Sequence, residues 1–274
     1  MTDATLASGV PMPRIGLGVF RAGSGDGTRT AVRSALDAGY RHIDTAAIYR
    51  NEAEVGEAIR RFCAHTGTPR DEIFVTTKLW NDDHGFDEAL RAFDRSLSAL
   101  GLEHIDQYLI HWPVPERRHA SWRALEQLHA ESRARTIGVS NFTMAHLEEL
   151  LAHATIPPAT NQVELHPWLP QPELVAWCRA HRIQTVAYSP LTKGRYLDHP
   201  VLTEVADRHG RTPAQVLIRW SLEQGHVVLP KSASPGRIRE NLAVLDWALD
   251  EEAGQQLATL ADATRTAWDP TDTP

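Results

Sequence analysis

The sequence is poor in cysteine and has no excess of positive charge. It contains two cysteines among its 274 residues, Cys63 and Cys178, and no CxxC motif. We therefore expect no disulfide framework and a reducing compartment. Lys and Arg number 28 against 35 Asp and Glu, so the formal net charge is −7. This charge argues against a nucleic-acid binder, because such proteins need a basic surface.

Long hydrophobic runs are absent as well. No segment approaches the roughly 18 consecutive apolar residues that a membrane-spanning helix requires. The first ten residues include Asp3, contain no Lys or Arg and lack an apolar centre, so we expect no signal peptide. Apolar residues make up 42% and charged residues 23% of the chain, a composition that excludes intrinsic disorder. These absences favour a folded cytoplasmic protein that binds neither membrane nor nucleic acid.

The chain does contain a regular alternation of two kinds of segment. Short runs rich in Val, Ile and Thr have the composition of buried strands. They cover residues 15–20, 41–46, 73–80, 105–112, 135–141, 159–165, 183–189 and 226–232. The segment 86–100 is typical of the amphipathic runs between them, since its apolar residues recur every three or four positions. These residues are Phe86, Ala89, Leu90, Phe93, Leu97 and Leu100.

Local signals mark where several predicted helices begin and end. Thr212 and Ser234 each precede a proline, the arrangement of an N-cap residue followed by the first helical position. Gly39 and Gly101 follow amphipathic runs and are predicted to be helix C-caps.

Strict alternation of strands and helices predicts a parallel sheet with helices outside it. Eight such units indicate a closed (β/α)8 TIM barrel, an α/β fold that would form a single domain over residues 1–274. Residues 5–15 precede the first unit and predict a β-hairpin that turns at Ser8-Gly9 and plugs the barrel floor, and a short C-terminal tail follows the last unit. The alternative is an open doubly wound sheet. However, Gly16-Leu17-Gly18 lacks the third glycine of the dinucleotide-binding fingerprint.

In such a barrel the working residues lie at the carboxyl ends of the strands. Several predicted strands end in polar or ionisable residues. These are Asp44, Lys78, His111, Ser140, Asn141, Gln162, Tyr188, Ser189 and Lys231. Any one of them could be an ordinary solvated turn residue, but their gathering on one face predicts a functional site.

Asp44, Lys78 and His111, together with Tyr49, form a group suited to carbonyl chemistry. A tyrosine titrates near ~10, and we expect the Lys78 ammonium to lower the pKa of Tyr49. Asp44 would hold Lys78 charged and in place, while His111 would donate a hydrogen bond to a substrate oxygen. The group would then polarise a carbonyl and deliver a proton to it. Each of these residues also has a non-catalytic alternative. Asp44 and Lys78 could form a structural ion pair, Tyr49 could be an aromatic residue on the rim, and His111 could be a hydrogen-bonded histidine of the core.

A metal-dependent barrel hydrolase would also place His and Asp at strand ends. The chain has 14 histidines, but no HxH pair and no HExxH motif. We therefore expect no metal site.

Three blocks of sequence resemble the signatures of the aldo-keto reductases. The first is GYRHIDTA (39–46), followed by Tyr49, Asn51-Glu52 and Gly56. The second is TIGVSNF (136–142), and the third is LPKS (229–232), followed by Arg237 and Glu240-Asn241. The likeness covers essentially the whole chain. The segments 46–52 and 76–82 are most similar to the 2,5-diketo-D-gluconate reductase type.

The resemblance implies NADPH-dependent reduction of aldehydes and ketones, including keto-sugars or α-dicarbonyls, to alcohols. It implies a catalytic tetrad in which Tyr49 donates the proton and the other members are Asp44, Lys78 and His111. Ser140, Asn141 and Gln162 match the residues that hold the nicotinamide carboxamide. Tyr188 matches the aromatic residue on which the nicotinamide stacks, and Ser189 and Leu191 match the pyrophosphate contacts. Lys231, Ser232 and Arg237 match the 2′-phosphate clamp, and Glu240 and Asn241 match the adenine contacts.

The position of Arg237 agrees with a phosphate site on physical grounds. It falls in the first turn of the helix predicted from Ser234-Pro235. A cation there opposes the helix dipole at a cost of roughly 0.3–1 kcal/mol. A bound phosphate would reverse that sign, because helix N-termini attract anions. With Lys231 nearby, NADPH is favoured over NADH.

Aromatic residues at strand ends predict a mostly apolar substrate pocket. Phe20, Trp80 and Trp112, with His111, match the family's substrate cleft, and Phe20 stands where many relatives have tryptophan. Trp268 in the C-terminal tail would either line this pocket or anchor the tail, while Arg265 would either attract an acidic substrate or be solvated. Nothing in the sequence demands more than a monomer.

The alternative function is a nucleotide-binding regulatory subunit of the same fold without significant turnover.

Overall fold

Eight parallel strands form one sheet in which neighbours along the chain are also neighbours in space. The computed structural model describes residues 3–23 and 25–271. The strands are β3 (Leu17–Gly18), β4 (His42–Asp44), β5 (Phe74–Leu79), β6 (Ile105–Ile110), β7 (Ala134–Ser140), β8 (Thr160–Glu164), β9 (Gln184–Tyr188) and β10 (Val227–Val228). Each of them starts and ends within a predicted run or one residue outside it, so the predicted strand order is confirmed.

Backbone contacts between the two ends of the sheet close it into a barrel. Ile15 bridges to Val228 and Gly18 to Lys231, both in parallel orientation. Gly16 N donates to Val228 O at 2.9 Å. The (β/α)8 barrel is therefore confirmed, and the open sheet is excluded. Strands β3 and β10 are two residues long, shorter than predicted, because isolated bridges replace a continuous ladder at the closure.

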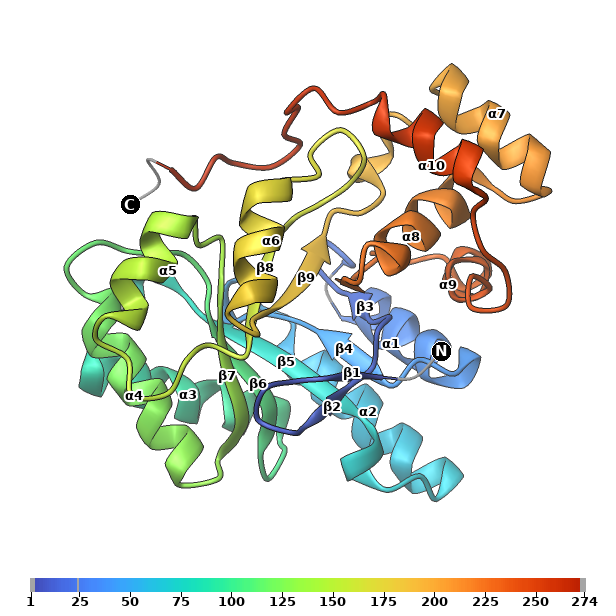
Figure 1. Cartoon of the computed structure of the whole chain (residues 1–274). Helices are drawn as coiled ribbons and strands as arrows, with labels where there is room; N and C mark the ends of the chain where they lie inside the picture. Colours follow the sequence, from blue (N-terminus) through green and yellow to red (C-terminus); the bar gives the residue numbers. More distant parts are fainter. Residues whose placement is uncertain (1–2, 24, 272–274) are drawn as a thin grey trace.

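Helices surround the sheet on the outside (Figure 1). One helix follows each of the first six strands, and α8 and α9 follow the last two. They are α1 (Asp26–Ala38), α2 (Glu52–Thr66), α3 (Phe86–Leu100), α4 (Arg118–Ala130), α5 (Met144–Leu151), α6 (Pro172–Ala180), α8 (Pro213–Glu223) and α9 (Pro235–Leu242). The strands are buried on both faces. Apolar side chains such as Ile43 and Val75 belong to the main core, whereas Thr76, Gln107 and Thr160 are joined by buried hydrogen bonds between strands.

The predicted helix boundaries hold in most places. Helix α3 spans the predicted residues 86–100, and Gly39 and Gly101 end α1 and α3 in the left-handed conformation. Thr212 caps α8 by accepting a hydrogen bond from Gln215 N. Ser234 occupies the N-cap position of α9 and Pro235 the first helical position, as predicted, although the Ser234 side chain makes no capping hydrogen bond. Its backbone N–H donates instead to Ser232 Oγ at 3.2 Å, which holds the turn before α9.

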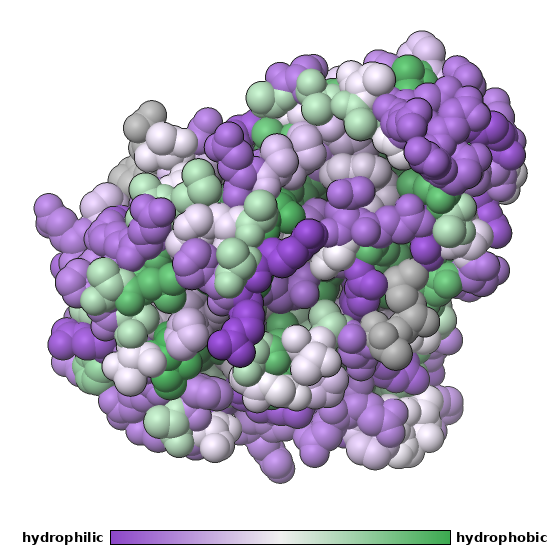
Figure 2. All heavy atoms as spheres, viewed as in Figure 1, coloured by the Kyte–Doolittle hydropathy of each residue, from purple (hydrophilic) through white to green (hydrophobic). Residues whose placement is uncertain are grey.

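Two helices, α7 (Pro200–His209) and α10 (Glu251–Ala258), lie outside the repeat. Helix α7 packs on α8, α10 packs on α7, and the three helices share a separate apolar cluster. It includes Leu202, Val205, Ala206, Val216, Leu217, Trp220, Ala253 and Leu257. Strand–helix alternation predicts one helix per strand and gives no sign of a second helix in the same connection. Figure 2 shows a strongly hydrophilic surface at the upper right, where α7 lies in Figure 1.

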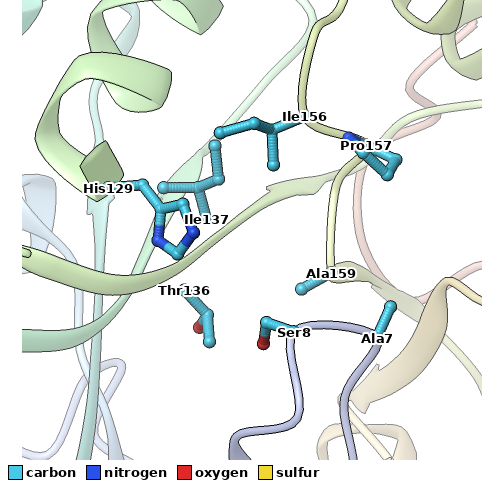
Figure 3. A pocket seen from close by; sticks show the side chains of 8 residues that line it. All are labelled: Ala7, Ser8, His129, Thr136, Ile137, Ile156, Pro157 and Ala159. Atoms are coloured by element: carbon cyan, nitrogen blue, oxygen red, sulfur yellow. The ribbon is translucent and has the colours of Figure 1, made fainter.

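The N-terminal hairpin closes the amino end of the barrel. Strands β1 (Ala4–Thr5) and β2 (Pro11–Met12) pair antiparallel, and Leu6 and Met12 belong to a buried apolar cluster with residues in or beside four barrel strands. Those residues are Phe74, Ala159, Val186, Val227 and Leu229. The predicted hairpin is therefore confirmed. A cavity of about 160 Å³ lies between its turn, at Ala7 and Ser8, and the side chains of His129, Ile137 and Ile156 (Figure 3).

Candidate active site

A buried ion pair joins the ends of two neighbouring strands. Lys78 Nζ in β5 lies 2.7 Å from Asp44 Oδ1 at the end of β4 and 2.8 Å from the carbonyl oxygen of Thr45. The second Asp44 oxygen accepts a hydrogen bond of 2.7 Å from Gln162 Nε2 in β8. A buried ion pair is tolerated only when further hydrogen bonds satisfy its members. These contacts meet that condition and join three strands.

Tyr49 and His111 lie beside this pair. Tyr49 ends a 3-10 turn, η1 (Ala47–Tyr49), and the centre of its ring lies 5.3 Å from Lys78 Nζ. His111 follows β6, and its ring meets that of Tyr49 edge-on with 5.9 Å between the ring centres. The structure therefore brings together the four residues expected to form the tetrad, two on a strand and two just beyond one.

Burial determines the protonation of this group. It lowers the pKa of Lys78, although Asp44 opposes the shift. It also lowers the pKa of His111 well below the usual value, with a smaller contribution from Lys78. His111 is therefore neutral at pH 7. A neutral imidazole still carries one N–H and can donate one hydrogen bond.

The pKa of Tyr49 shifts in the direction opposite to our expectation. Burial raises it well above the usual value, and Asp44 and Tyr188 add to the rise. The prediction that Lys78 lowers this pKa is wrong, because desolvation of the phenolate and the Asp44 charge dominate. Tyr49 thus keeps its proton at neutral pH and gives it up only to a strong base.

The residues matched to the nicotinamide side form one network at the ends of β7, β8 and β9. Ser140 Oγ donates to Gln162 O at 2.8 Å, and Asn141 Nδ2 donates to His111 O at 3.0 Å. Tyr188 OH donates to Asn141 Oδ1 at 2.8 Å. Since Gln162 also binds Asp44, this network is continuous with the tetrad. Asn141 has a left-handed backbone (φ 64°), a conformation that asparagine tolerates better than most residues.

The residues matched to the pyrophosphate, the 2′-phosphate and the adenine come from later parts of the chain, after β9 and around α9. Ser189 and Leu191 are half-buried in the loop after β9, where Ser189 is left-handed (φ 50°). Ser232 is buried just before α9, and Asn241 is buried within it. Glu240 is half-buried, and its carboxylate accepts a 2.7 Å hydrogen bond from Thr212 Oγ1.

Two cations stand exposed at the start of α9. Lys231 precedes it, and Arg237 lies in its first turn, as predicted. Within residues 3–23 and 25–271, neither forms an ion pair with an acidic side chain. Free cations beside the N-terminus of a helix are suited to a phosphate group. This arrangement fits the 2′-phosphate of NADPH.

Aromatic side chains surround the tetrad. The centre of the Phe20 ring lies 5.0 Å from that of Tyr49, and Trp80 meets His111 edge-on at 5.3 Å. Phe20 is 41% exposed, as expected for a residue on the wall of an open pocket. Trp112 is buried between His111 and Trp268, so it packs against the wall more than it lines the opening.

Comparison with known proteins agrees with this arrangement. The model of the Aldo/keto reductase family matches residues 14–262. The chain belongs to the aldo/keto reductase family.

Individual relatives of this aldo/keto reductase cover nearly all of it. The uncharacterized oxidoreductase YtbE of Bacillus subtilis is 48% identical over 267 residues, which are 97% of this chain and 95% of the relative. The methylglyoxal reductase DkgA of Escherichia coli is 44% identical and covers 98% of this chain and 97% of its own length. The protein is therefore an oxidoreductase by family. Its likeness to the 2,5-diketo-D-gluconate reductase type stays a prediction.

Solved structures give the same result for the fold. An aldo-keto reductase from a deep-sea metagenome library, MGS-M4, superposes with a TM-score of 0.94 at 42% identity, over 99% of both chains. A Bombyx mori aldo-keto reductase in complex with NADP superposes with a TM-score of 0.92 at 34% identity, over 99% of this chain and 97% of the other.

We also searched the described part of this aldo/keto reductase for a metal-binding group and for a membrane-spanning helix. Among the described residues, no group of three or more His, Cys, Asp or Glu side chains has a geometry that could hold a metal ion. No helix within the same residues is long and apolar enough to cross a membrane.

One buried acid in this aldo/keto reductase was missed from the sequence. Glu164 is the last residue of β8 and is almost fully buried. It lies in the predicted strand 159–165, for which only Gln162 was predicted as a site residue. A charged residue inside an apolar run is itself a signal, because an ionised carboxylate is rarely buried without dedicated partners.

Proposed function

We propose that this protein is an NADPH-dependent reductase that converts aldehydes and ketones, including α-dicarbonyls or keto-sugars, to alcohols. The observation that carries the proposal is the position of Tyr49 next to the buried Lys78–Asp44 pair and to neutral His111. These residues offer a proton and a hydrogen bond to one oxygen atom. The relative named as a methylglyoxal reductase supports the α-dicarbonyl class.

Bound NADPH would supply the hydride that adds to the carbonyl carbon. Ser140, Asn141, Gln162 and Tyr188 would hold its nicotinamide, and Ser189 and Leu191 would contact its pyrophosphate. Lys231, Ser232 and Arg237 would clamp the 2′-phosphate, and Glu240 and Asn241 would contact the adenine. The aldo-keto reductase structure with NADP supports this choice of cofactor.

The remaining chemistry belongs to the side chains. His111 donates a hydrogen bond to the carbonyl oxygen and polarises it. As negative charge develops there, that oxygen becomes a stronger base than a phenolate and takes the proton of Tyr49. Lys78, held by Asp44, stabilises the phenolate that Tyr49 becomes. Phe20, Trp80 and Trp112 exclude water and orient the apolar part of the substrate.

The test is turnover with a panel of aldehydes, α-dicarbonyls and keto-sugars, followed by the loss of absorbance of the reduced nicotinamide. NADPH and NADH are compared in parallel. Turnover with a preference for NADPH is the expected result. Tight NADPH binding without turnover of any substrate would contradict the proposal and support a regulatory nucleotide-binding role.

We also propose that the enzyme is a monomer and lies in the cytoplasm. Both cysteines are free, which agrees with a reducing compartment. Size-exclusion chromatography with light scattering would test the oligomeric state.

A further inference from the structure

The C-terminal segment crosses the carboxyl end of the barrel. After α10 it runs above α6 and towards α5, at the end of the sheet opposite the N-terminal hairpin (Figure 1). It carries Trp268, whose ring centre lies 6.0 Å from that of Trp112. Trp112 in turn stacks on His111, with 6.5 Å between ring centres. A side chain of this segment therefore lies two aromatic contacts away from the tetrad.

The segment is attached to the barrel through one carboxylate. Thr266 donates both its backbone N–H, at 2.7 Å, and its hydroxyl to Glu164 Oε1. Ala267 N donates to Glu164 Oε2 at 3.1 Å. His166 Nε2 lies 3.1 Å from Oε1 and must be the donor, because a carboxylate can only accept. Three of these four donors belong to the tail.

Burial and charge make this attachment specific. Glu164, His166 and Thr266 are each at most 6% exposed, so water competes little for these hydrogen bonds. Burial would raise the pKa of Glu164, but the hydrogen bonds from His166, Thr266 and Ala267 outweigh it and lower the pKa to about 2. The carboxylate is therefore ionised across the neutral range, and charge-assisted hydrogen bonds of this kind are stronger than neutral ones.

A second contact joins the tail to the loop after β9. Lys193 in η4 (Thr192–Gly194), two residues after Leu191, donates to the carbonyl oxygen of Thr266. Arg265 lies 3.3 Å from Asp269 and spans the turn that carries Trp268. Thr266 is thus held from both sides, while Trp268 itself is 68% exposed.

We propose that Glu164 is a positioning residue that anchors the C-terminal tail and thereby holds Trp268 over the substrate pocket. The geometry selects substrates whose apolar part is long enough to reach Trp268. Substrates that extend no further than Phe20 and Trp80 are indifferent to the anchor. The statement about substrates rests on the proposed reductase function, whereas the anchoring of the tail does not.

The first test is hydrogen–deuterium exchange of Glu164→Gln without cofactor or substrate. The amide keeps the shape of the side chain but loses the charge and turns an N–H₂ group towards tail donors. Exchange at the amides of Thr266 and Ala267 should accelerate at least about tenfold, while the barrel strands stay protected. Glu173→Gln, the same change at an exposed carboxylate in α6, is the control and should alter nothing.

The second test is steady-state kinetics. In Glu164→Gln the KM for a long aromatic aldehyde should rise several-fold, with kcat and the KM for a short aliphatic aldehyde unchanged. In a Trp268→Ala background the same substitution should cause no further rise, because the anchored side chain is already gone. A purely structural role of Glu164 would not produce this dependence on substrate length and on Trp268.

The outcomes are separable. If the amides of Thr266 and Ala267 exchange in Glu164→Gln at the same rate as in the wild type, the proposal that Glu164 anchors the tail is wrong. If exchange also increases in the barrel strands, a second variant, Thr266→Val, decides between a local and a global effect. This variant removes only the hydroxyl donor, so exchange in the tail should increase to a smaller degree. Unchanged exchange in the tail of Thr266→Val would overturn the proposal. If no aldehyde is turned over by any variant while exchange responds as expected, the reductase function fails and the anchor stands.

Discussion

Lys78 Nζ and Asp44 Oδ1 are 2.7 Å apart, and neither side chain is more than 5% exposed. Two strands meet at this contact, and Gln162 brings in a third through the other Asp44 oxygen. The pair therefore serves structure and chemistry together. It joins the carboxyl ends of β4, β5 and β8, and it fixes an ammonium group beside the phenol of Tyr49.

Removal of one partner should be more harmful than removal of both. Asp44→Asn leaves a buried ammonium without its counter-charge and should lower the free energy of unfolding by about 3–5 kcal/mol. The double variant Asp44→Asn/Lys78→Met should recover part of this loss, because it no longer buries a charge. Urea denaturation of the wild type, both single variants and the double variant measures the coupling. A double variant no more stable than Asp44→Asn would contradict the interpretation.

Tyr49→Phe removes the proton donor and leaves the ring in place. Reduction of every substrate should fall by at least about 100-fold, the range that general acid catalysis contributes. The dissociation constant for NADPH, measured by fluorescence titration, should change little. Tyr196→Phe is a matched control, because Tyr196 stacks on Trp168 outside the tetrad. Retained turnover in Tyr49→Phe would remove Tyr49 from its role.

Lys231→Ala should discriminate between the two nicotinamide cofactors. The loss of a charge-assisted contact to phosphate should weaken NADPH binding by about tenfold or more. NADH lacks that phosphate, and its binding should hardly change. Arg239→Ala removes another exposed cation in α9 and serves as control. Equal losses for NADPH and NADH would mean that the 2′-phosphate lies elsewhere.

Three buried histidines predict a loss of stability in mild acid. Burial lowers the pKa of His42, His84 and His226 to about 4. Between pH 6.5 and 4 the unfolded chain binds more protons than the folded one, so stability falls as the pH falls. These three groups together contribute at most about 4 kcal/mol per pH unit to the slope.

Unfolding in urea at a series of pH values measures this slope. His226→Gln, which can keep a hydrogen bond to Thr185 Oγ1, should reduce the slope by up to about one proton's contribution, about 1.4 kcal/mol per pH unit. An unchanged slope in this variant would show that His226 is not one of the responsible groups.

Gly56→Ala should strongly destabilise the barrel wall. Gly56 lies inside α2, and a Cβ atom there would come within 1.8 Å of the Leu100 carbonyl oxygen in α3. The two helices would have to separate, at a cost of about 1–3 kcal/mol or more. Gly254→Ala in α10 is the control, since nothing lies within 4 Å of that position and the change should stabilise the helix by about 0.5–1 kcal/mol. Thermal unfolding of the two variants should shift in opposite directions.

Local rules explain why much of the fold was predictable. Residues 86–100 have helical periodicity and become α3, and the short Val- and Ile-rich runs become strands in the order expected. The carboxyl ends of parallel strands meet at one end of a barrel, so Asp44 and Lys78 could be placed together without coordinates. Helices α7 and α10 were not predicted because they lie outside the strand–helix repeat, where their apolar residues form a separate cluster with those of α8.

The sequence by itself determined the barrel, because periodicity and strand ends are local properties of the chain. The tertiary structure decided what depends on burial and on contacts distant in sequence. The pKa of Tyr49 rises because the fold removes water from its phenolate and brings Asp44 near it, a balance that the list of neighbouring residues did not reveal. The hydrogen bond from Thr266 to Glu164 joins residues 102 positions apart, and no local pattern marks that partnership. Both are decided by the environment that the assembled barrel creates around each charged group.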